Sequence, residues 1–273
     1  FSYGIYFYYS QDFWILNNEV NDSSASAFRT YGHSSVPAAH VRRGTIDNNT
    51  FRDSTSYEMY LYNYILDSNF TNNVMTGSTS RGIFMYAGYQ DNNLFVNNSI
   101  EIDTTSYRYG IYMYHPTVTF SNLTFINNTI TTAGTGQYAV LIYPQESSGD
   151  IVNILFDGLN VKTSGSESPS FAFLGYRSVD KKVENFVIQN SVLNSTSYGA
   201  ISYYGNTSTD STPDLYNNYV IDTIIDTSGG SANAIYFIDY NASHVSPNNI
   251  TFINVTNIDG ELDWSAAGDG FLF

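Results

Sequence analysis

Polar and apolar residues alternate in a short phrase that returns about ten times along the chain, at intervals of roughly thirty residues. The clearest copies occupy residues 4–8, 82–86 and 110–114. Looser copies begin at Ala27, Glu58, Ala139, Ala172, Ala200, Ala234 and Gly270. Self-similarity at this period is typical of a solenoid, in which each repeat forms one turn that packs on the next.

The columns of the aligned phrase alternate with a period of two. The second position is apolar in every copy, the fourth is apolar in most, and the first is Gly or Ala except at Glu58. Such alternation predicts a strand with one buried face. We therefore expect parallel, in-register strands whose second-position side chains form one buried row. These residues are Ile5, Phe28, Met59, Ile83, Ile111, Val140, Phe173, Ile201, Ile235 and Phe271.

A second phrase, apolar-x-Asn-Asn-x-apolar, follows the first and is clearest at residues 15–20, 95–100 and 125–130. Asn tolerates left-handed backbone and closes turns with its own side chain. Amides stacked at the coil spacing of about 4.8 Å also hydrogen-bond along the stack. We expect an inward amide ladder bonded to neighbouring backbone rather than a row of metal ligands, because amides bind transition metals weakly. The predicted ladder comprises Asn17, Asn48, Asn72, Asn97, Asn127 and Asn254.

These phrases, the corner asparagines and the short strands resemble the right-handed parallel β-helix proteins of the pectin-lyase-like superfamily, closest in composition to adhesin-like surface proteins. The resemblance covers residues 1–273 and implies an all-β, single-domain parallel β-helix of about nine coils. It implies little about activity, because the superfamily includes polysaccharide lyases, glycosidases, adhesins and tailspikes. Since both chain ends fall inside the first phrase and no initiating Met is present, we expect a mature form or a segment of a longer chain.

Tyrosine fills the fifth position of the phrase in coil after coil. By the period of two, these side chains and the aromatic residues at the third position point away from the core. A face so rich in aromatic residues is too apolar to be covered by solvent alone. Loops, a second subunit or stacked sugar rings are the three candidate occupants. The predicted aromatic face contains Tyr8, Tyr31, Tyr62, Tyr86, Tyr114, Tyr143, Tyr176 and Tyr204.

Composition excludes several classes of function. The net charge of −15 repels nucleic acid and anionic lipid headgroups. The chain has no Cys, so zinc-thiolate and iron–sulfur sites are excluded, and we expect no cofactor. No apolar run approaches the roughly 18 residues of a membrane span, so we expect no membrane insertion in this segment.

Asn-x-Ser/Thr sequons recur along the chain, and together with the composition they favour an extracellular, exported location with N-glycosylation at some positions. The candidate acceptors are Asn21, Asn48, Asn69, Asn97, Asn122, Asn127, Asn194, Asn206, Asn241, Asn249 and Asn254.

Catalytic candidates are few. The resemblance implies lyases with a Lys or Arg base and glycosidases with paired carboxylates, and neither pattern is present. One residual cluster in the second coil could eliminate across an acidic sugar, with Tyr as acid and Arg holding the carboxylate. It consists of Tyr31, His33, His40, Arg42 and Arg43. We favour the structural explanation for this cluster, namely polar loop residues that bond neighbouring loops.

The densest acidic stretch contains Asp259, Glu261 and Asp263, whose alternate spacing is a weak candidate for Ca²⁺. A solvated loop is the simpler interpretation. The sequence therefore favours a non-catalytic structural or adhesive protein of the cell surface, with a polysaccharide lyase or glycosidase as the alternative. Expected partners are glycans, copies of the same chain stacked head-to-tail or laterally, or further coils of a longer chain.

Overall fold

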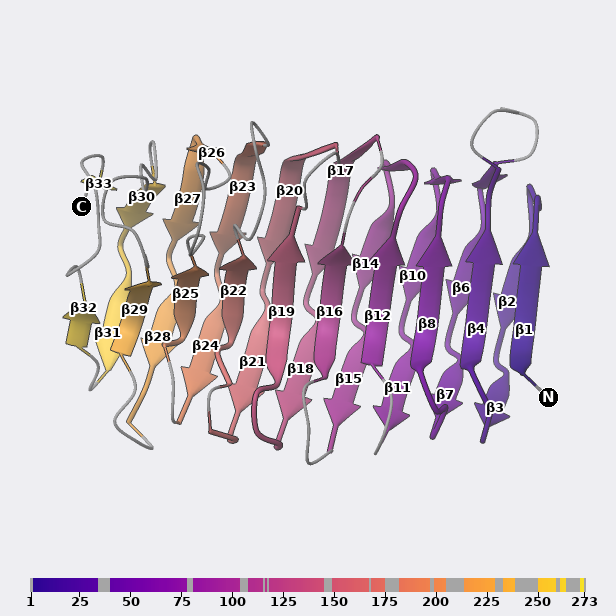
Figure 1. Ribbon diagram of the computed structural model, residues 1–273, viewed down its shortest axis with the longest axis horizontal. Coiled ribbons are helices and arrows are strands. Elements are labelled where there is room, and N and C mark those ends of the chain that lie inside the picture. Colours follow the sequence, from indigo (N-terminus) through magenta and orange to yellow (C-terminus); the bar gives the residue numbers. More distant parts are fainter. Residues whose placement is uncertain are drawn as a thin grey trace.

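The first and second phrases form strands that pair in parallel with the equivalent strands of the preceding and following coils. The computed structural model describes residues 2–272 apart from 34–39, 78–80, 104–107, 115, 117, 145–148, 167, 175–181, 197–198, 205–213, 229–232, 239–249, 259–260 and 264–270. Three parallel sheets run side by side along the long axis (Figure 1). The fold is thus the all-β parallel β-helix that the sequence predicts. The described part of the chain contains no helix that could cross a membrane.

The first phrase builds the first sheet, which has ten strands among the described residues. They are β1 (Tyr3–Tyr8), β4 (Ser26–Tyr31), β8 (Tyr57–Tyr62), β12 (Arg81–Tyr86), β16 (Tyr109–Tyr114), β19 (Tyr138–Tyr143), β22 (Phe171–Leu174), β25 (Ile201–Tyr204), β29 (Asn233–Ile238) and β32 (Glu261–Asp263).

The second phrase supplies the other two sheets. The second sheet contains β2 (Trp14–Leu16), β6 (Thr45–Asp47), β10 (Asn69–Thr71), β14 (Leu94–Val96), β17 (Thr119–Ile126), β20 (Asp150–Asp157), β23 (Lys182–Gln189), β27 (Asn218–Ile221), β30 (Ile250–Ile253) and β33 (Phe271–Leu272), with β5 (Val41–Arg42), β9 (Ile65–Leu66), β13 (Gln90–Asp91) and β26 (Asp214–Tyr216) beside this path. The third sheet contains β3 (Glu19–Asn21), β7 (Thr50–Arg52), β11 (Val74–Gly77), β15 (Ser99–Ile102), β18 (Thr129–Thr132), β21 (Asn160–Thr163), β24 (Val192–Ser195), β28 (Ile224–Asp226) and β31 (Thr256–Ile258).

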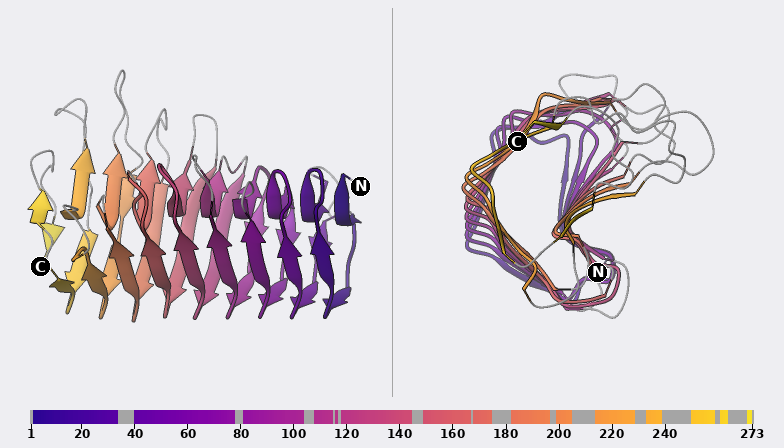
Figure 2. Two further views of the ribbon diagram at one scale, coloured as in Figure 1. Left: turned by 90° about the horizontal axis from the view of Figure 1, so that it is seen from below. Right: turned by 90° about the vertical axis from the view of Figure 1, so that its left-hand side faces the viewer.

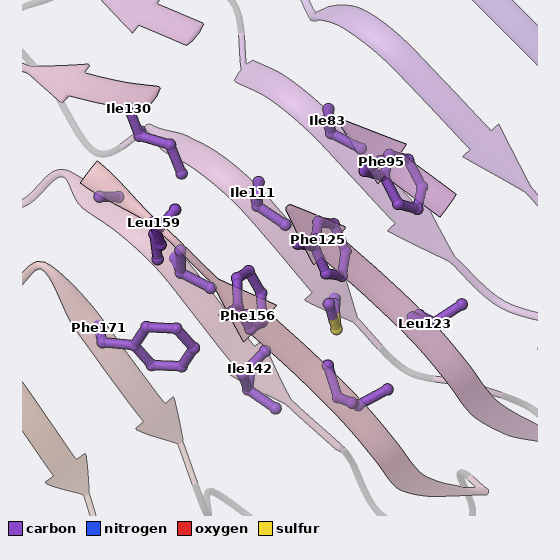
Figure 3. Packing of buried hydrophobic residues seen from close by; sticks show 14 of the residues in the cluster. Ile83, Phe95, Ile111, Leu123, Phe125, Ile130, Ile142, Phe156, Leu159 and Phe171 are labelled. Atoms are coloured by element: carbon purple, nitrogen blue, oxygen red, sulfur yellow. The ribbon is translucent and has the colours of Figure 1, made fainter. Parts of the chain in front are cut away.

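The predicted buried row is present in the first sheet. Ile83 pairs with Ile111 and Ile111 with Val140, and all three side chains are fully buried. Ile5 lies at the end of the row and is only partly buried. A column of phenylalanines from the second sheet faces this row across the core (Figure 3). Stacked aromatic pairs of this kind add about 0.5–1.5 kcal/mol each beyond the area they bury.

The sequence-based alignment placed two copies of the first phrase wrongly. Phe171, not Phe173, pairs with Val140 and Ile201, so that copy begins two residues earlier than its small residues suggest. Phe271 pairs with Ile250 in the second sheet, so Phe271 and Leu272 do not belong to another first-phrase strand. The first error arose because Ala172, a small residue at the third position of the phrase, was taken for the first position.

The small first position lies where neighbouring coils approach one another closely. A Cβ at Gly82 would collide with the carbonyl oxygen of Gly110 and with the Ile100 side chain. Glu58 occupies the same position and is fully buried. Its carboxylate accepts hydrogen bonds from the backbone N–H and the hydroxyl of Ser54, at 3.1 and 3.0 Å. These two donors satisfy a buried carboxylate that otherwise carries a large desolvation cost.

The amide ladder exists, but the predicted asparagines are not its buried members. Asn48 and Asn97 have φ of 52° and 54° and are exposed, and their amides bond the preceding corner side chains. The next residue of each pair, Asn49 or Asn98, is buried instead. The prediction of an inward ladder at Asn17, Asn48, Asn72, Asn97 and Asn127 is therefore wrong by one residue, and Asn254 likewise lies on the exposed side. The left-handed corner residue turns its side chain outward, and the following extended residue turns inward.

Seen along the long axis, the outline of the coils is indented on one side (Figure 2). The first sheet, which begins at the N-terminus, forms this indented side, and the second and third sheets form the rest of the outline. The aromatic residues of the first phrase therefore lie on a distinct face of the molecule.

Candidate functional site

The outer side of the first sheet carries rows of tyrosine, which we call the aromatic face. Its rows are formed by the third and fifth positions of the phrase and by the residue just before it. The described members are Tyr3, Tyr6, Tyr8, Arg29, Tyr31, Tyr57, Tyr60, Tyr62, Arg81, Phe84, Tyr86, Tyr109, Tyr112, Tyr114, Tyr138, Leu141 and Tyr143.

The fifth-position row is continuous through six coils. Tyr8 pairs with Tyr31, and each later tyrosine pairs with its equivalent in the next strand. Ring centroids in this row are 5.0–5.5 Å apart. These spacings follow from strand pairing, because parallel in-register strands stack identical positions at about 4.8 Å. In β8, β12, β16 and β19 the fifth-position tyrosine is partly exposed and follows a buried residue.

Two predicted members lie beyond the six coils of this row. Tyr176 lies outside the described residues, and Leu174 pairs with Tyr204 at the fifth position instead. Tyr204 occupies the predicted position in β25, and its side chain is not described.

The third-position row is almost completely covered in the middle coils, although it points outward, whereas Tyr6 at its N-terminal end is 44% exposed. Phe84 and Tyr112 are only 6% and 9% exposed. Tyr57 stacks on Phe84 with ring centroids 4.7 Å apart, and Tyr109 lies 4.4 Å from Tyr112. The covering rings belong to the residue just before the phrase, a row that sequence reasoning missed. Its signal was a Tyr directly before the small first residue, as in Tyr109-Gly110.

Burial of this row affects the phenol groups. Desolvation raises the pKa of Tyr60 and Tyr112 well above the ordinary value for tyrosine, and the nearby tyrosines reinforce the shift. The guanidinium groups of Arg29 and Arg81 lower the pKa of Tyr60 and Tyr112, respectively, but only partly offset the burial. These phenols therefore stay neutral at physiological pH.

Two arginines are embedded among the rings. The Arg29 guanidinium carbon lies 4.8 Å from the ring centroid of Tyr3 and 4.9 Å from that of Tyr60. Arg81 lies 5.2 Å from the ring of Tyr57 and 5.5 Å from that of Tyr109. Cation–π contacts of this kind contribute about 0.5–2 kcal/mol.

Neither arginine has a carboxylate partner within the described ranges. The ion pairs found there join Arg43 to Asp12 and Arg52 to Glu19, away from the aromatic face. The Nε atoms of Arg29 and Arg81 are buried without a hydrogen-bond partner. Arg29 donates through Nη1 to the hydroxyl of Tyr3. The face thus combines flat apolar rings with two cations that form no ion pair with any described carboxylate.

The residues of the catalytic cluster proposed for the second coil contact several different neighbours. Tyr31 belongs to the aromatic row, and the His33 ring contacts Tyr9. Arg43 forms a bidentate pair with Asp12, at 2.6 and 2.7 Å, and this hydrogen bonding lowers the pKa of that carboxyl.

His40 and Arg42 interact electrostatically. Burial lowers the pKa of His40, and the charge of Arg42 lowers it further. The His40 ring stacks on Tyr64 at 4.7 Å. The contacts described above place Tyr31, His33, His40 and Arg43 against different neighbouring residues.

The other predicted sites are only partly described. Asp259 lies outside the described residues, while Glu261 and Asp263 occupy alternate positions of β32 with side chains that are not described. The described ranges hold no group of three or more His, Asp or Glu residues placed to bind a metal ion. Asn206, Asn241 and Asn249 also lie outside the described residues.

Comparison with known proteins gives one match. A family profile described as "Right handed beta helix region" matches residues 1–158, more than half of the chain. No curated protein and no solved structure matches the chain.

Proposed function

We propose that the chain, which belongs to the right-handed β-helix family, is an exported structural or adhesive protein that makes contact through its aromatic face. The observation that carries the proposal is the continuous row of stacked rings from Tyr8 to Tyr143 on one side of the solenoid. Tyr8 is 51% exposed, and its equivalents in the next five coils are partly exposed. Aromatic side chains of this kind supply large contact areas with little loss of conformational entropy.

A carbohydrate chain bearing carboxylates fits this face better than a second copy of the protein. Sugar rings stack on aromatic rings, and the guanidinium groups of Arg29 and Arg81 attract carboxylates that approach from solvent. A second copy carries the same two arginines on its own aromatic face. Pairing of two such faces would bring these like charges together.

The test is binding to a soluble polyuronate, with a neutral glucan of similar length as the comparison. In the double variant Tyr62→Ala, Tyr86→Ala we expect at least a tenfold loss of polyuronate affinity. Arg81→Gln should weaken polyuronate binding and leave any glucan binding unchanged, because it removes charge from the face. The matched control is Tyr219→Ala, a partly exposed tyrosine of the second sheet.

Two results would contradict the proposal. One is the absence of binding to either glycan, and the other is an equal loss of affinity in the Tyr219→Ala control. Sedimentation of the same proteins tests the remaining possibility, that the face packs against a second copy of the chain. If the parent chain forms large particles that the double variant does not form, the face packs against a second copy instead.

A further inference from the structure

The sequons are distributed unevenly around the solenoid. Among the described residues, Asn48, Asn97, Asn127 and Asn254 lie at the exposed corner between the second and third sheets. None of the described sequon asparagines lies in a strand of the first sheet. The aromatic face is therefore free of acceptors over the described part of the chain.

The remaining described sequons also lie away from that face. Asn69 and Asn122 belong to the second sheet, while Asn21 and Asn194 belong to the third. Asn21, Asn69 and Asn122 are exposed, and Asn194 is half-buried. Their side chains lie on the outer surface of these two sheets.

The Asn-Asn-Ser/Thr repeat explains this placement. In residues 97–99 and 127–129 the first Asn is the sequon acceptor and the second is not. The first is the left-handed, exposed residue of the corner, whereas Asn98 and Asn128 are buried and donate to backbone carbonyls. The fold thus turns the acceptor of each such pair outward.

Modification at these corners is compatible with the exposed hydrogen bonds. The Asn48 amide donates to Asn17 Oδ1 at 2.7 Å, and the Asn97 amide donates to Asn72 Oδ1 at 3.3 Å. Attachment of a sugar replaces one of the two amide hydrogens, so one hydrogen remains to donate to the preceding coil. The buried Asn98 uses its amide for both the Phe70 carbonyl and Asn128 Oδ1, and so has no hydrogen to lose.

We propose that, on export through a glycosylating secretory route, the outward asparagines of the second and third sheets become N-glycosylated while the aromatic face stays bare. The co-reactant is an oligosaccharide carried on a lipid pyrophosphate. The asparagine amide nitrogen forms a bond to the anomeric carbon as the bond from that carbon to the pyrophosphate oxygen breaks. The electron pair of that bond leaves with the pyrophosphate, and the amide nitrogen releases one proton. This inference is independent of what the aromatic face binds.

The short distance between acceptors on adjacent coils limits how many of them carry a glycan at the same time. Asn97 and Asn127 belong to successive coils, because their flanking strands β14 and β17 pair in register. Their attachment points are therefore about one strand spacing, 4.8 Å, apart. Two branched oligosaccharides do not fit side by side at that distance, so these two acceptors compete.

The experiment secretes the 273-residue chain from a eukaryotic host and removes its glycans with a peptide N-glycosidase in ¹⁸O-water. Former acceptors then become ¹⁸O-labelled Asp, which peptide mass spectrometry locates. We expect label at the outward asparagines and none at Asn98 or Asn128. Thr129→Ala destroys the Asn127 sequon and should raise the occupancy of Asn97 at least twofold, and Ser99→Ala should have the converse effect. Absence of label while a co-secreted glycoprotein is labelled would overturn the proposal, as would label at the buried asparagines.

A second measurement tests whether the aromatic face stays bare. Binding of the apolar dye anilinonaphthalene sulfonate is compared before and after glycan removal. In the parent chain it should change by less than twofold. In the double variant Tyr60→Asn, Tyr62→Thr, which places a sequon on the aromatic face, glycan removal should increase dye binding severalfold. A severalfold increase in the parent chain would show that its glycans cover the face, and would refute this part of the proposal.

Discussion

Replacement of Asn98 by Leu tests the buried amide ladder directly. Asn98 is 1% exposed, and its side chain makes four hydrogen bonds. It donates to the Phe70 carbonyl at 2.8 Å and to Asn128 Oδ1 at 3.0 Å. It accepts from the backbone N–H of Asn73 at 3.1 Å and from the amide of that residue at 3.0 Å.

The variant Asn98→Leu removes all four bonds and leaves the buried N–H of Asn73 without this acceptor. An orphaned buried donor costs about 1–3 kcal/mol, and each other lost bond costs about 0.5–1.5 kcal/mol. Burial of the leucine side chain offsets about 1.5–3 kcal/mol of this loss. We expect the free energy of unfolding to fall by about 3 kcal/mol, measured by urea denaturation followed by circular dichroism.

The matched control is Asn97→Gly, one residue earlier. Asn97 is exposed with φ of 54°, and Gly adopts this conformation without strain. Only the exposed bond to Asn72 at 3.3 Å is lost, so the control should cost less than about 1 kcal/mol. Equal destabilisation by the two substitutions would refute the assignment of the inner ladder. Hydrogen exchange at Asn73 adds a local readout, because that N–H should lose protection in Asn98→Leu and keep it in Asn97→Gly.

Three further outcomes are expected. Ile111→Asp should abolish the cooperative unfolding transition, because it places an unpaired charge at a fully buried position, whereas Ile111→Val should cost about 0.5–1.5 kcal/mol. Burial raises the pKa of Tyr60 and Tyr112, so the folded chain keeps phenol protons that the unfolded chain releases. Their contribution to the free energy of unfolding is therefore fully present below a pH of about 10 and declines as the pH rises above it. The urea midpoint should fall less steeply across that pH range in Tyr60→Phe than in the parent chain. Incubation with pectate or alginate should yield no unsaturated uronate and no new reducing ends. Product that disappears in His40→Ala or Arg42→Ala would establish the second-coil cluster as a catalytic site.

The fold was predictable because two kinds of period were visible at once. Recurrence about every thirty residues indicated stacked coils, and alternation within the phrase indicated which side of each strand is buried. The pairing of Ile83 with Ile111 follows from those two facts alone. Neither depends on contacts that only folding reveals.

Which of the two asparagines in each pair faces inward was not predictable in the same way. Alternation assigns sides correctly only while the backbone stays extended. A single left-handed residue, such as Asn97 with φ of 54°, displaces the alternation by one position. Both members of an Asn-Asn pair tolerate that conformation, so composition does not choose between them.

The exposure of the aromatic face could not be predicted without the three-dimensional structure, for a different reason. Alternation gives the direction of a side chain but not what covers it. Parallel in-register stacking surrounds each ring with the same row of the next coil, and the residue before the phrase adds a further row. Phe84 and Tyr112 are therefore covered by neighbouring rings of their own sheet.

The two arginines on the face occupy positions that tyrosine fills in neighbouring coils. Arg29 pairs with Tyr6 on one side and with Tyr60 on the other, and Arg81 pairs with Tyr57. A cation in such a position gains cation–π contacts from the adjacent rings but loses hydration, so it adds little to the stability of the solenoid. What it does add is a positive charge on a strongly acidic protein, held rigidly between flat rings. A face built only for packing against further tyrosines has no use for that charge, whereas a face that receives carboxylated sugar rings uses both the charge and the rings around it.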